Sequence, residues 1–406
     1  MRALPHRRTE IAAVYLTGLI QGICLVTFPA AGSIFRSPEA HGLTSNEYGT
    51  LFLPMIVCAI FASSLGGGLA VRWGSKRVFL LGLAFNLISM VLLALSQTVT
   101  GMHNAAYGFL LLAMGALGVG FGGTLTMINT YAAGFFPEKT ATALTVLHAI
   151  LGTGTALAPI LLTGFVRAGG WWGQPVAIAV GFLILIPWAL SLPLETRSAE
   201  DRAERVGPLA ALQKLPAPFW GFGAIAVLYG ICETLFGNWA TIYLHEEKRL
   251  SLDMAALALS TFWALVTVGR LLVAGISLWL PPQKIYRGMP LLILAALLGI
   301  PSFQEPVFLV MGFAVAGLAC SAFLPLTIGF AERNAHGMPE LASGVIVAAY
   351  MLGFGIGAYG VGPIRDSGGI SISAIYTGSG VFAAGMAVLG FSMTRKGNLP
   401  EATQAG

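Results

Sequence analysis

Apolar residues gather in long runs along the chain, and short polar segments separate these runs. Residues 78–95 and 176–194 are two examples. A helix needs about 20 residues to cross a hydrocarbon core of about 30 Å, and the runs have that length. A membrane barrel would show segments of about ten residues in which apolar and polar positions alternate. The pattern instead predicts an all-α polytopic membrane protein with twelve spans. We place the spans at 11–35, 47–70, 78–97, 104–135, 141–166, 175–194, 218–244, 254–280, 286–303, 306–330, 342–364 and 371–393, with Pro290 and Pro301 interrupting the ninth.

Composition supports the same class. Of the 406 residues, 56% are hydrophobic and only 10% are charged, against about 25% charged in a soluble domain. Mean hydropathy is +0.81, so lipid must surround most of the chain. The basic start at Arg2, Arg7 and Arg8 resembles a secretory signal, but the apolar stretch 11–35 exceeds the about 7–15 residues of a signal's apolar region. We therefore interpret it as the first span.

Lysine and arginine indicate the orientation, because cytoplasmic loops of membrane proteins are enriched in them. With the N-terminus in the cytoplasm, sixteen of the 22 Lys and Arg residues fall in cytoplasmic segments, five fall in outer segments, and Arg270 lies within a span. This split predicts that both termini are cytoplasmic. It also favours an even number of spans.

The longest charged connection divides the spans into two sets of six. Residues 195–217 hold four acids and four bases and end in a proline-rich stretch. We expect an N-terminal six-helix bundle over 1–194, a cytoplasmic linker over 195–217, a C-terminal six-helix bundle over 218–394 and a cytoplasmic tail over 395–406. Transporters are often built from such repeated halves, with the substrate site between them near the middle of the membrane.

The loop between the second and third spans carries a motif. Residues 67–77 read Gly-Gly-Leu-Ala-Val-Arg-Trp-Gly-Ser-Lys-Arg. This resembles the signature loop of the major facilitator superfamily, Gly-x-Leu-Ala-Asp-Arg-x-Gly-Arg-Arg/Lys, and it occurs at the same place in the chain. The resemblance implies the fold of that superfamily, with two pseudo-symmetric bundles, and a conformational latch on the cytoplasmic side. The latch residues would be Gly67, Arg72, Gly74, Lys76, Arg77 and, as a candidate partner of Arg72, Glu138.

The chain departs from the signature at one position. The acidic residue of the family is Val71 here. In the family, that carboxylate helps to hold the cytoplasmic side closed in the outward-open state. The latch of this chain would therefore be weaker or would use another acid. Glu138, at the cytoplasmic end of the fourth span, is one candidate, and a solvated loop charge is the alternative.

Two further stretches resemble a subgroup. Residues 129–159, with Asn129, a Phe-Pro-Glu-Lys turn and Pro159, are similar to the fourth and fifth spans of the fucose:proton symporter group. The pattern at 229–243 is similar to the seventh span of that group. Drug-antiporter patterns fit badly, because Met114 stands near the place of their fourth-span arginine and Ala158 replaces the glycine of their Gly-Pro pair.

Glu233 is the acid expected deepest in the membrane. It lies about 15 residues into the seventh span, or about 22 Å from its inner end. An ionisable group at that depth is costly and therefore a functional candidate. A carboxyl group in such a setting can exchange protons near neutral pH, so we assign Glu233 to proton coupling. The alternative is a structural hydrogen bond to a neighbouring helix.

Arg270 and His148 are the other ionisable candidates. Arg270 lies about 15 Å from the inner end of the eighth span, where a guanidinium needs a carboxylate, several carbonyls or an anionic substrate. The resemblance implies substrate binding in some members and a structural role in others. His148, in the fifth span, can titrate and is a second candidate for proton coupling. It can equally serve as a hydrogen-bonding residue only.

Neutral amides and aromatic residues complete the candidate set. Amides offer donors and acceptors to hydroxyl-rich ligands, but they also join helices. Aromatic rings can stack on a sugar or serve as packing. We favour the amides of the first and fourth spans over Asn86 of the third. The candidate substrate-binding residues are Gln21, Asn129, Asn238, Arg270, Tyr229, Trp239, Trp263 and Tyr350.

These observations predict a secondary active transporter that moves a small polar solute, a sugar or related compound, by proton-coupled alternating access. An organic-anion transporter or exchanger that uses Arg270, and an exporter of amphipathic compounds, are the alternatives. The chain has no phosphate-binding loop and no nucleophile–base pattern, so we expect neither ATP drive nor an enzyme. We expect no cofactor, no metal and no nucleic acid, and a monomer in a bacterial inner membrane.

Overall fold

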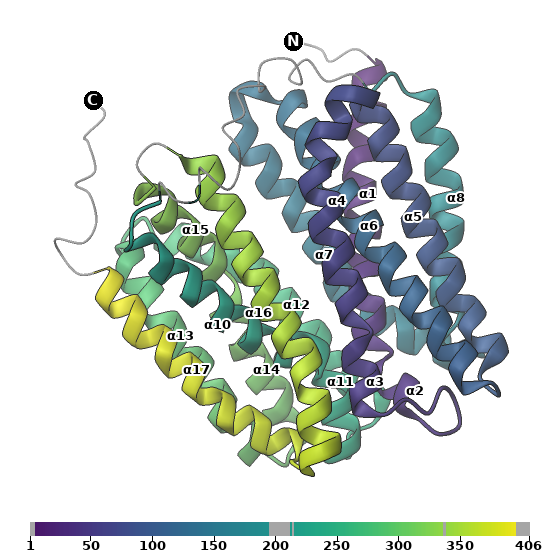
Figure 1. Ribbon diagram of the computed structural model, residues 1–406, viewed down its shortest axis with the longest axis vertical. Helices are drawn as coiled ribbons and strands as arrows, with labels where there is room; N and C mark the ends of the chain where they lie inside the picture. Colours follow the sequence, from purple (N-terminus) through teal and green to yellow (C-terminus); the bar gives the residue numbers. More distant parts are fainter. Residues whose placement is uncertain (1–4, 195–211, 213–214, 336–337, 395–406) are drawn as a thin grey trace.

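The computed structural model describes residues 5–194, 212, 215–335 and 338–394. Within these residues it has twelve helical spans long and apolar enough to cross a membrane (Figure 1), which confirms the predicted number. The helices before residue 195 are α1 (Pro5–Ala30), α2 (Gly32–Arg36), α3 (Ser45–Thr50), α4 (Phe52–Trp73), α5 (Ser75–Ser96), α6 (His103–Phe135), α7 (Thr140–Ala168) and α8 (Gly173–Ser191).

The helices after residue 215 mirror this set. They are α10 (Phe219–Asn238), α11 (Ala240–Ile242), α12 (Leu252–Ile276), α13 (Pro282–Gly299), α14 (Pro306–Cys320), α15 (Phe323–Arg333), α16 (Pro339–Gly368) and α17 (Ile372–Met393). The predicted seventh span is shorter than expected, because α10 ends at Asn238. A π-helical turn at Tyr243–Glu247 then follows α11. The ninth span runs through Pro290, and Pro301 lies in a 3₁₀ turn after α13.

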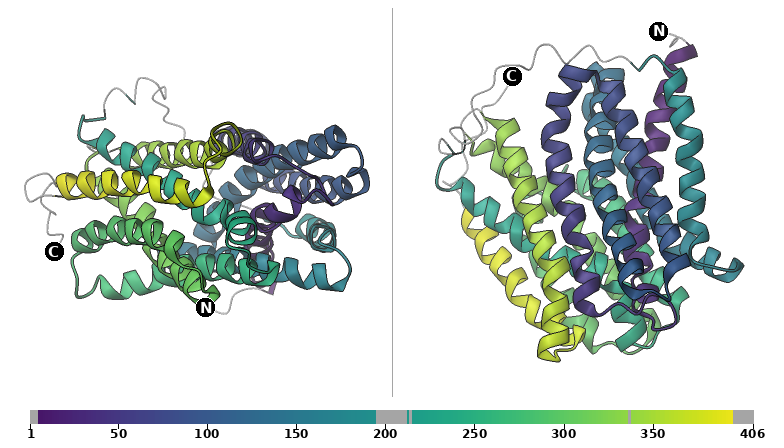
Figure 2. Two further views of the ribbon diagram at one scale, coloured as in Figure 1. Left: turned by 90° about the horizontal axis from the view of Figure 1, so that it is seen from below. Right: turned by 45° about the vertical axis from the view of Figure 1, so that its right-hand side comes forward.

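The helices form two groups that lie side by side, α1 to α8 in one and α10 to α17 in the other (Figures 1 and 2). Helix α1 begins and α17 ends at the same side of the molecule, which we call the terminal face. The two groups diverge at this face and meet at the opposite face. Most of the predicted linker 195–217 and the whole predicted tail 395–406 lie outside the described residues.

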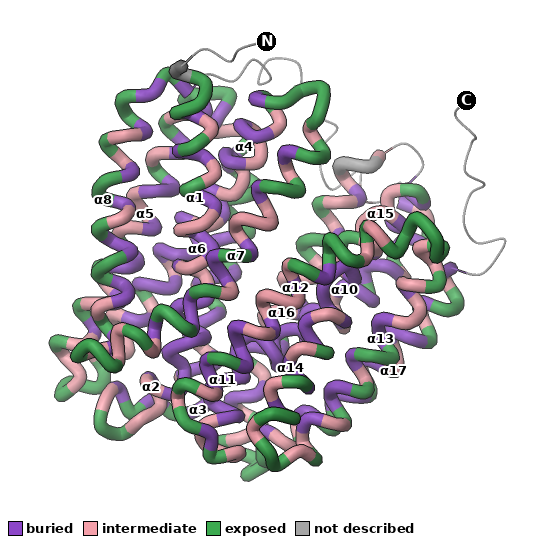
Figure 3. The backbone as a smooth tube through the Cα atoms, turned by 180° about the vertical axis from the view of Figure 1, so that it is seen from behind, coloured by how far each residue is buried: buried purple, intermediate pink, exposed green. Residues whose placement is uncertain are grey.

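The outer surface of the helices is apolar, as a lipid-facing surface must be. Large hydrophobic side chains such as Leu112, Ile184 and Val388 are exposed there. Buried residues instead follow the helix faces that point toward other helices (Figure 3). The burial pattern therefore agrees with a bundle whose solvent is lipid.

Glycines allow two pairs of helices to cross closely. A Cβ atom on Gly22 of α1 would lie 2.0 Å from the carbonyl oxygen of Leu151 in α7. A Cβ atom on Gly353 of α16 would lie 2.0 Å from the carbonyl oxygen of Val227 in α10. The first and fifth spans thus cross in one group as the seventh and eleventh do in the other. This equivalence is typical of repeated transporter halves.

The tenth span is broken in its middle, between α14 and α15. Proline has no N–H, and its ring clashes with the carbonyl four residues earlier. Pro325 of α15 therefore leaves the carbonyl of Ser321 without its usual helical partner. The two residues between the helices, Ser321 and Ala322, are not helical. The break exposes backbone carbonyls to side chains from neighbouring helices.

Candidate transport site

A cavity of about 920 Å³ lies between the two groups of helices. One wall comes from α1, α4, α6 and α7, and the other comes from α10, α12, α15 and α16. The cavity reaches from Pro29 and Asn238 to Leu144, near the start of α7, and Pro282, at the start of α13. The last two positions are near the terminal face, so the cavity extends toward that face.

The opposite face is closed by contacts between the groups. Arg36 of α2 donates from Nε to Glu246 Oε1 at 2.7 Å, and Arg365 of α16 binds the other oxygen of Glu246 at 2.8 Å. These side chains are only 15–24% exposed. The carboxylate of Asp366 accepts from the backbone N–H of Asn46 at 2.7 Å. Arg36 and Asn46 belong to one group, and Glu246 and Asp366 belong to the other. The Arg36–Glu246 and Asn46–Asp366 bonds therefore join the two groups.

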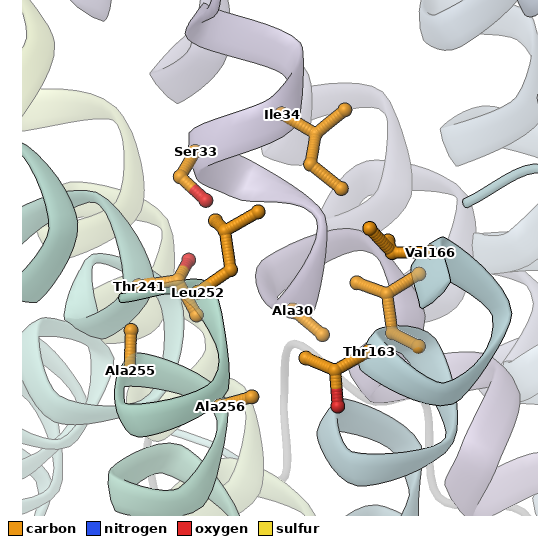
Figure 4. A pocket seen from close by; sticks show the side chains of 10 residues that line it. Ala30, Ser33, Ile34, Thr163, Val166, Thr241, Leu252, Ala255 and Ala256 are labelled. Carbon is orange, nitrogen blue, oxygen red and sulfur yellow. The ribbon is translucent and has the colours of Figure 1, made fainter. Parts of the chain in front are cut away.

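Close packing lies beneath these ion pairs. The phenol of Tyr48 donates to the carbonyl of Asn238, and Thr241 donates to the carbonyl of Pro29, each at 2.7 Å. Figure 4 shows the neighbouring contact, where Ser33 and Thr241 come from opposite groups. The cavity at this contact measures only about 10 Å³. A solute in the large cavity therefore meets a seal at this end.

Glu233 is buried in the wall of the large cavity, at 5% exposure. The phenol of Tyr350, from α16, donates to its Oε2 atom. Tyr229 Oη lies 2.7 Å from Glu233 Oε1 and 2.9 Å from the carbonyl oxygen of Cys320 at the helix break. The close crossing of α10 and α16 at Gly353 is what brings Tyr350 to Glu233. The carboxyl group is thus held by side chains from its own helix and from the helix it crosses.

Arg270 lines the same cavity and is exposed to it. Its Nε atom donates to the carbonyl of Ser321 at 3.1 Å, the carbonyl that Pro325 frees. It makes no ion pair within 4.0 Å with a described acid, but it lies within electrostatic range of Glu233 and His148. The helix break therefore anchors the guanidinium through one nitrogen, and its two Nη atoms make no hydrogen bond to a described residue.

Three further candidates line the cavity. His148 of α7 faces Arg270 from the other group of helices and makes no hydrogen bond to another described residue. The Nδ2 atom of Asn238 and the Nε1 atom of Trp263 are buried and have no described hydrogen-bond partner. Buried donors are nearly always paired. Both atoms are covered by protein in this conformation, so a solute reaches them only when the surrounding side chains shift.

Three predicted substrate-binding residues lie outside the cavity lining. Gln21 is fully buried, and its amide exchanges hydrogen bonds with Asn86 of α5, the shorter at 2.6 Å. Asn129 of α6 has a buried, unpaired Oδ1 atom. Trp239 is packed against Tyr48 in the closed face and donates to the carbonyl of Ala358. In this conformation these three residues contact other helices and not the cavity.

The predicted latch residues lie at the terminal face. Gly74 is the single residue between α4 and α5, and its φ is 86°. Glycine adopts this conformation freely, unlike other residues. Lys76 donates to the carbonyls of Leu190 and Leu192 at the end of α8. A latch for the outward-open state would be released in a conformation that opens at this face. Arg72, Arg77 and Glu138 make no ion pair within 4.0 Å among the described residues, and the latch role of these residues and of Gly67 stays a prediction.

The sequence analysis did not single out the ion pairs of the closed face. The predicted spans leave Arg36, Glu246 and Arg365 in the segments that follow a span. It also treated the tenth span as continuous, although Pro325 in the middle of that span was a signal for the break. The pairing of these charged residues depends on how the two groups of helices meet. Their partners therefore cannot be identified from spacing along the sequence.

The comparison with protein families settles the class. The profile of the Major Facilitator Superfamily matches residues 11–358. The chain belongs to the major facilitator superfamily. The signature at 67–77 and the twelve spans are thus explained by descent, and the protein is a membrane transporter.

Curated relatives of this major facilitator are distant. It is 23% identical over 378 residues to the membrane protein MosC of Rhizobium meliloti, and the alignment covers 92% of this chain and 88% of MosC. It is 20% identical over 283 residues to the glucose/mannose transporter GlcP of Bacillus subtilis, covering 67% of this chain and 70% of GlcP.

Solved structures share the fold of this major facilitator. A point mutant of the nucleoside transporter NupG superposes with a TM-score of 0.79 at 16% identity, over 95% of this chain and 100% of that one. The D-xylose-proton symporter superposes with a TM-score of 0.72 at 15% identity, over 97% and 98%. At these identities, the likeness describes architecture and not substrate.

Proposed function

We propose that this major facilitator is a proton-coupled secondary transporter that moves a small polar solute, a sugar or a related compound, by alternating access. The bundles 1–194 and 218–394 would rock about the central cavity. Glu233 would carry the coupled proton. The observation that carries the proposal is the hydrogen-bond arrangement around this buried carboxyl group.

The arrangement has a place for one additional proton. Tyr229 has a single hydroxyl proton but lies within hydrogen-bonding distance of two acceptors, Glu233 and the carbonyl of Cys320. With Glu233 ionised, one of these buried acceptors loses its donor. With Glu233 protonated, the carboxyl donates to Tyr229, and Tyr229 donates to Cys320. Every group is then satisfied, which favours a protonated Glu233 in this conformation.

The solute class is supported by the similar proteins and by the cavity wall. The named activities of the similar proteins concern glucose and mannose, nucleosides, and D-xylose with protons. The unpaired N–H groups of Asn238 and Trp263 are covered in this conformation, and they would pair with the oxygens of such a solute once the cavity closes around it. Trp263 and Tyr350 also present aromatic rings in the cavity wall.

We propose that the terminal face is cytoplasmic. Of the Lys and Arg residues in the described part of the chain, Arg270 aside, nine lie at helix ends of that face and five at the opposite face, and cytoplasmic loops are enriched in them. The conformation described is then the inward-open one. We further propose that the protein acts as a monomer in a bacterial inner membrane. Release of the ion pairs of the closed face would lead to the outward-open state.

Proteoliposomes that contain a pH-sensitive dye test the proposal. The proteoliposomes carry the purified full-length protein. D-glucose, D-xylose, uridine and D-gluconate are added outside the vesicles. We expect at least one solute to drive proton movement, and an imposed pH gradient to drive its accumulation. Solute uptake that neither moves protons nor responds to a pH gradient would contradict the proposal.

A specific observation favours a second candidate, export of amphipathic compounds. Much of the cavity wall is apolar, with Phe52, Met55, Leu117, Phe121 and Phe354 among its residues. This candidate would be supported if cells that express the protein resist amphipathic compounds and lose this resistance with the Glu233→Gln variant. Unchanged sensitivity to a panel of cationic dyes would contradict it.

A further inference from the structure

We infer that the transported solute is a small hydroxylated carboxylate, and that its carboxylate takes the place of ionised Glu233 as the counter-charge of Arg270. This inference rests on the proposed proton coupling at Glu233 and adds the charge of the solute. It is carried by the charged groups of the cavity wall and by the donors left unpaired there.

The cavity holds very few charged groups. Among its lining residues only Glu233, Arg270 and His148 ionise near neutral pH. When Glu233 is protonated, as its hydrogen bonds favour, the positive charge of Arg270 has no acid within 4.0 Å among the described residues to balance it. In the described conformation Arg270 is exposed to the cavity, but in alternating access the cavity must close around the solute and exclude water, and an unbalanced charge is then costly. An anionic group on the solute removes that cost, whereas a neutral sugar leaves it.

The guanidinium is held in a suitable position for an anion. Its Nε atom is fixed on the carbonyl of Ser321, so the side chain is oriented before the solute arrives. Its two Nη atoms make no described hydrogen bond, and paired N–H groups of arginine match the geometry of a carboxylate. His148 faces the guanidinium from α7, so one anionic group can contact both bundles.

The remaining unpaired groups are also donors. Asn238 Nδ2 and Trp263 Nε1 lie in the cavity wall toward the closed face. Gly237 lets the Trp263 ring approach α10, since a Cβ atom there would lie 3.0 Å from the ring. These two N–H groups are covered in this conformation, and they become available if closure of the cavity shifts their neighbours. A solute that then satisfies them and Arg270 carries a carboxylate at one end and hydroxyl or carbonyl oxygens at the other.

The charge balance distinguishes carboxylates from phosphate esters. A monocarboxylate together with one proton on Glu233 crosses the membrane with no net charge, and Arg270 is balanced in every loaded state. A phosphate monoester carries about −1.5 to −2 charges at neutral pH, which exceeds the charge of Arg270 as long as His148 is neutral. Near Glu233 the other charged or titratable groups are Tyr229, Tyr350, Cys320 and Arg270, and His148 faces Arg270 from α7 and adds a positive charge only when it is protonated.

Binding to the purified full-length protein is measured first, by thermal shift at pH 6 and pH 8. The probes are D-gluconate and D-glucuronate, their neutral counterpart D-glucose, and D-glucose 6-phosphate. We expect the carboxylates to stabilise the protein, more strongly at pH 6, and the other probes to have little effect. Arg270→Gln should weaken carboxylate binding at least tenfold. Lys284→Gln, which removes an exposed positive charge outside the cavity lining, should not.

Membrane potential provides the second measurement. In proteoliposomes with a potassium and valinomycin gradient, uptake of a carboxylate with one proton should not respond to the potential. This inference would be overturned if D-glucose were the one probe that binds and if its uptake with a proton responded to the potential. That result would leave the proposed function intact. Unchanged carboxylate binding in Arg270→Gln, stronger binding of the phosphate ester, or no stabilisation by any carboxylate at millimolar concentration would also overturn it. Carboxylate binding without any proton movement would contradict the proposed function instead.

Discussion

Arg36 of α2 and Glu246 of the π-helical turn after α11 form an ion pair at 2.7 Å that joins the two groups of helices at the closed face. Glu246 also binds Arg365, so one carboxylate holds two guanidinium groups. Partly buried pairs of this kind are screened less by water than exposed pairs are. The pair is therefore suited to stabilise the conformation whose cavity extends toward the terminal face.

Removal of this pair should shift the conformational equilibrium. We expect Arg36→Gln to increase the distance between spin labels on cysteines placed at Met102 and Ile370, which lie on loops of the two groups at the closed face. The measurement is double electron–electron resonance in a Cys58→Ala background, since Cys58 is the native cysteine that is not buried. Glu246 keeps Arg365 as a partner in this variant, so the variant removes only the bond between the two groups. A hydrogen bond to a charged group contributes about 1.5–3 kcal/mol, enough to change the ratio of the two conformations about tenfold or more.

Arg167→Gln is the matched control for Arg36→Gln. Its pair with Asp253 also joins the two groups at 2.7 Å, but the side chains are 71% and 47% exposed. Exposed pairs contribute about 0–1 kcal/mol, so this variant should leave the label distances nearly unchanged. Equal distance changes in both variants would contradict the role given to the Arg36–Glu246 pair.

The crossing of α10 and α16 should tolerate no side chain at Gly353. We expect Gly353→Ala to lower the melting temperature, because overpacking a tight contact costs about 1–3 kcal/mol. It should also reduce solute-driven proton movement, since it displaces Tyr350 from Glu233. Gly360→Ala in the same helix meets no atom within 4 Å and serves as the control. Full stability of Gly353→Ala would show that the crossing is looser than described.

Tyr350 should affect coupling more than folding. Tyr350→Phe removes the phenol that donates to Glu233. When Glu233 releases its proton, this bond to the ionised carboxylate contributes about 1.5–3 kcal/mol, so the variant should disfavour the release. We expect proton-coupled uptake to fall about tenfold or more, with a small change in melting temperature. Tyr359→Phe, near the other end of α16 and outside the cavity lining, should behave like the wild type. Normal coupling in Tyr350→Phe would separate this phenol from the proton site.

The closed face should lose stability in acid because of His41, which lies between α2 and α3. Burial and the neighbouring His103 lower the pKa of His41 to about 4, from an ordinary value of about 6.5. The folded protein therefore favours neutral His41. Its contribution to stability is present above about pH 6.5 and is lost as the pH falls toward 4. The melting temperature should decrease by several degrees over that range.

His41→Gln should make this pH dependence shallower, and differential scanning fluorimetry between pH 7 and pH 4.5 measures it. His245→Gln is the control, because His245 follows α11 and its Nδ1 atom donates to the carbonyl of Leu250. An unchanged slope in His41→Gln would show that other groups dominate the acid response.

Much of the fold was predictable because each span must satisfy its own backbone in lipid. The apolar runs therefore gave the twelve spans, and Glu233, Arg270 and His148 were found because ionisable residues in spans are rare. Depth along a helix could not tell that Gln21 points at Asn86 while Asn238 lines the cavity. That choice depends on helix rotation, which glycine crossings such as Gly22 with Leu151 determine.

The residues of the closed face illustrate a second limit. Arg36 and Glu246 are 210 positions apart, and loop charges look alike in a sequence whether they are solvated or paired. The break at Ser321 was within reach of the sequence, because Pro325 removes a helical hydrogen bond. Its consequence for Arg270 was not, since Arg270 comes from a different span.

Proton-driven uptake by the Glu233→Gln variant tests the central claim most directly. The transported solute is measured in proteoliposomes in two ways, as accumulation under a pH gradient and as counterflow without one, with Glu305→Gln as a matched loss of an exposed acid outside the cavity lining. We predict that Glu233→Gln loses accumulation but retains counterflow, because the amide mimics the protonated acid and cannot release a proton, while Glu305→Gln retains both. Full proton-driven accumulation by Glu233→Gln would contradict the account.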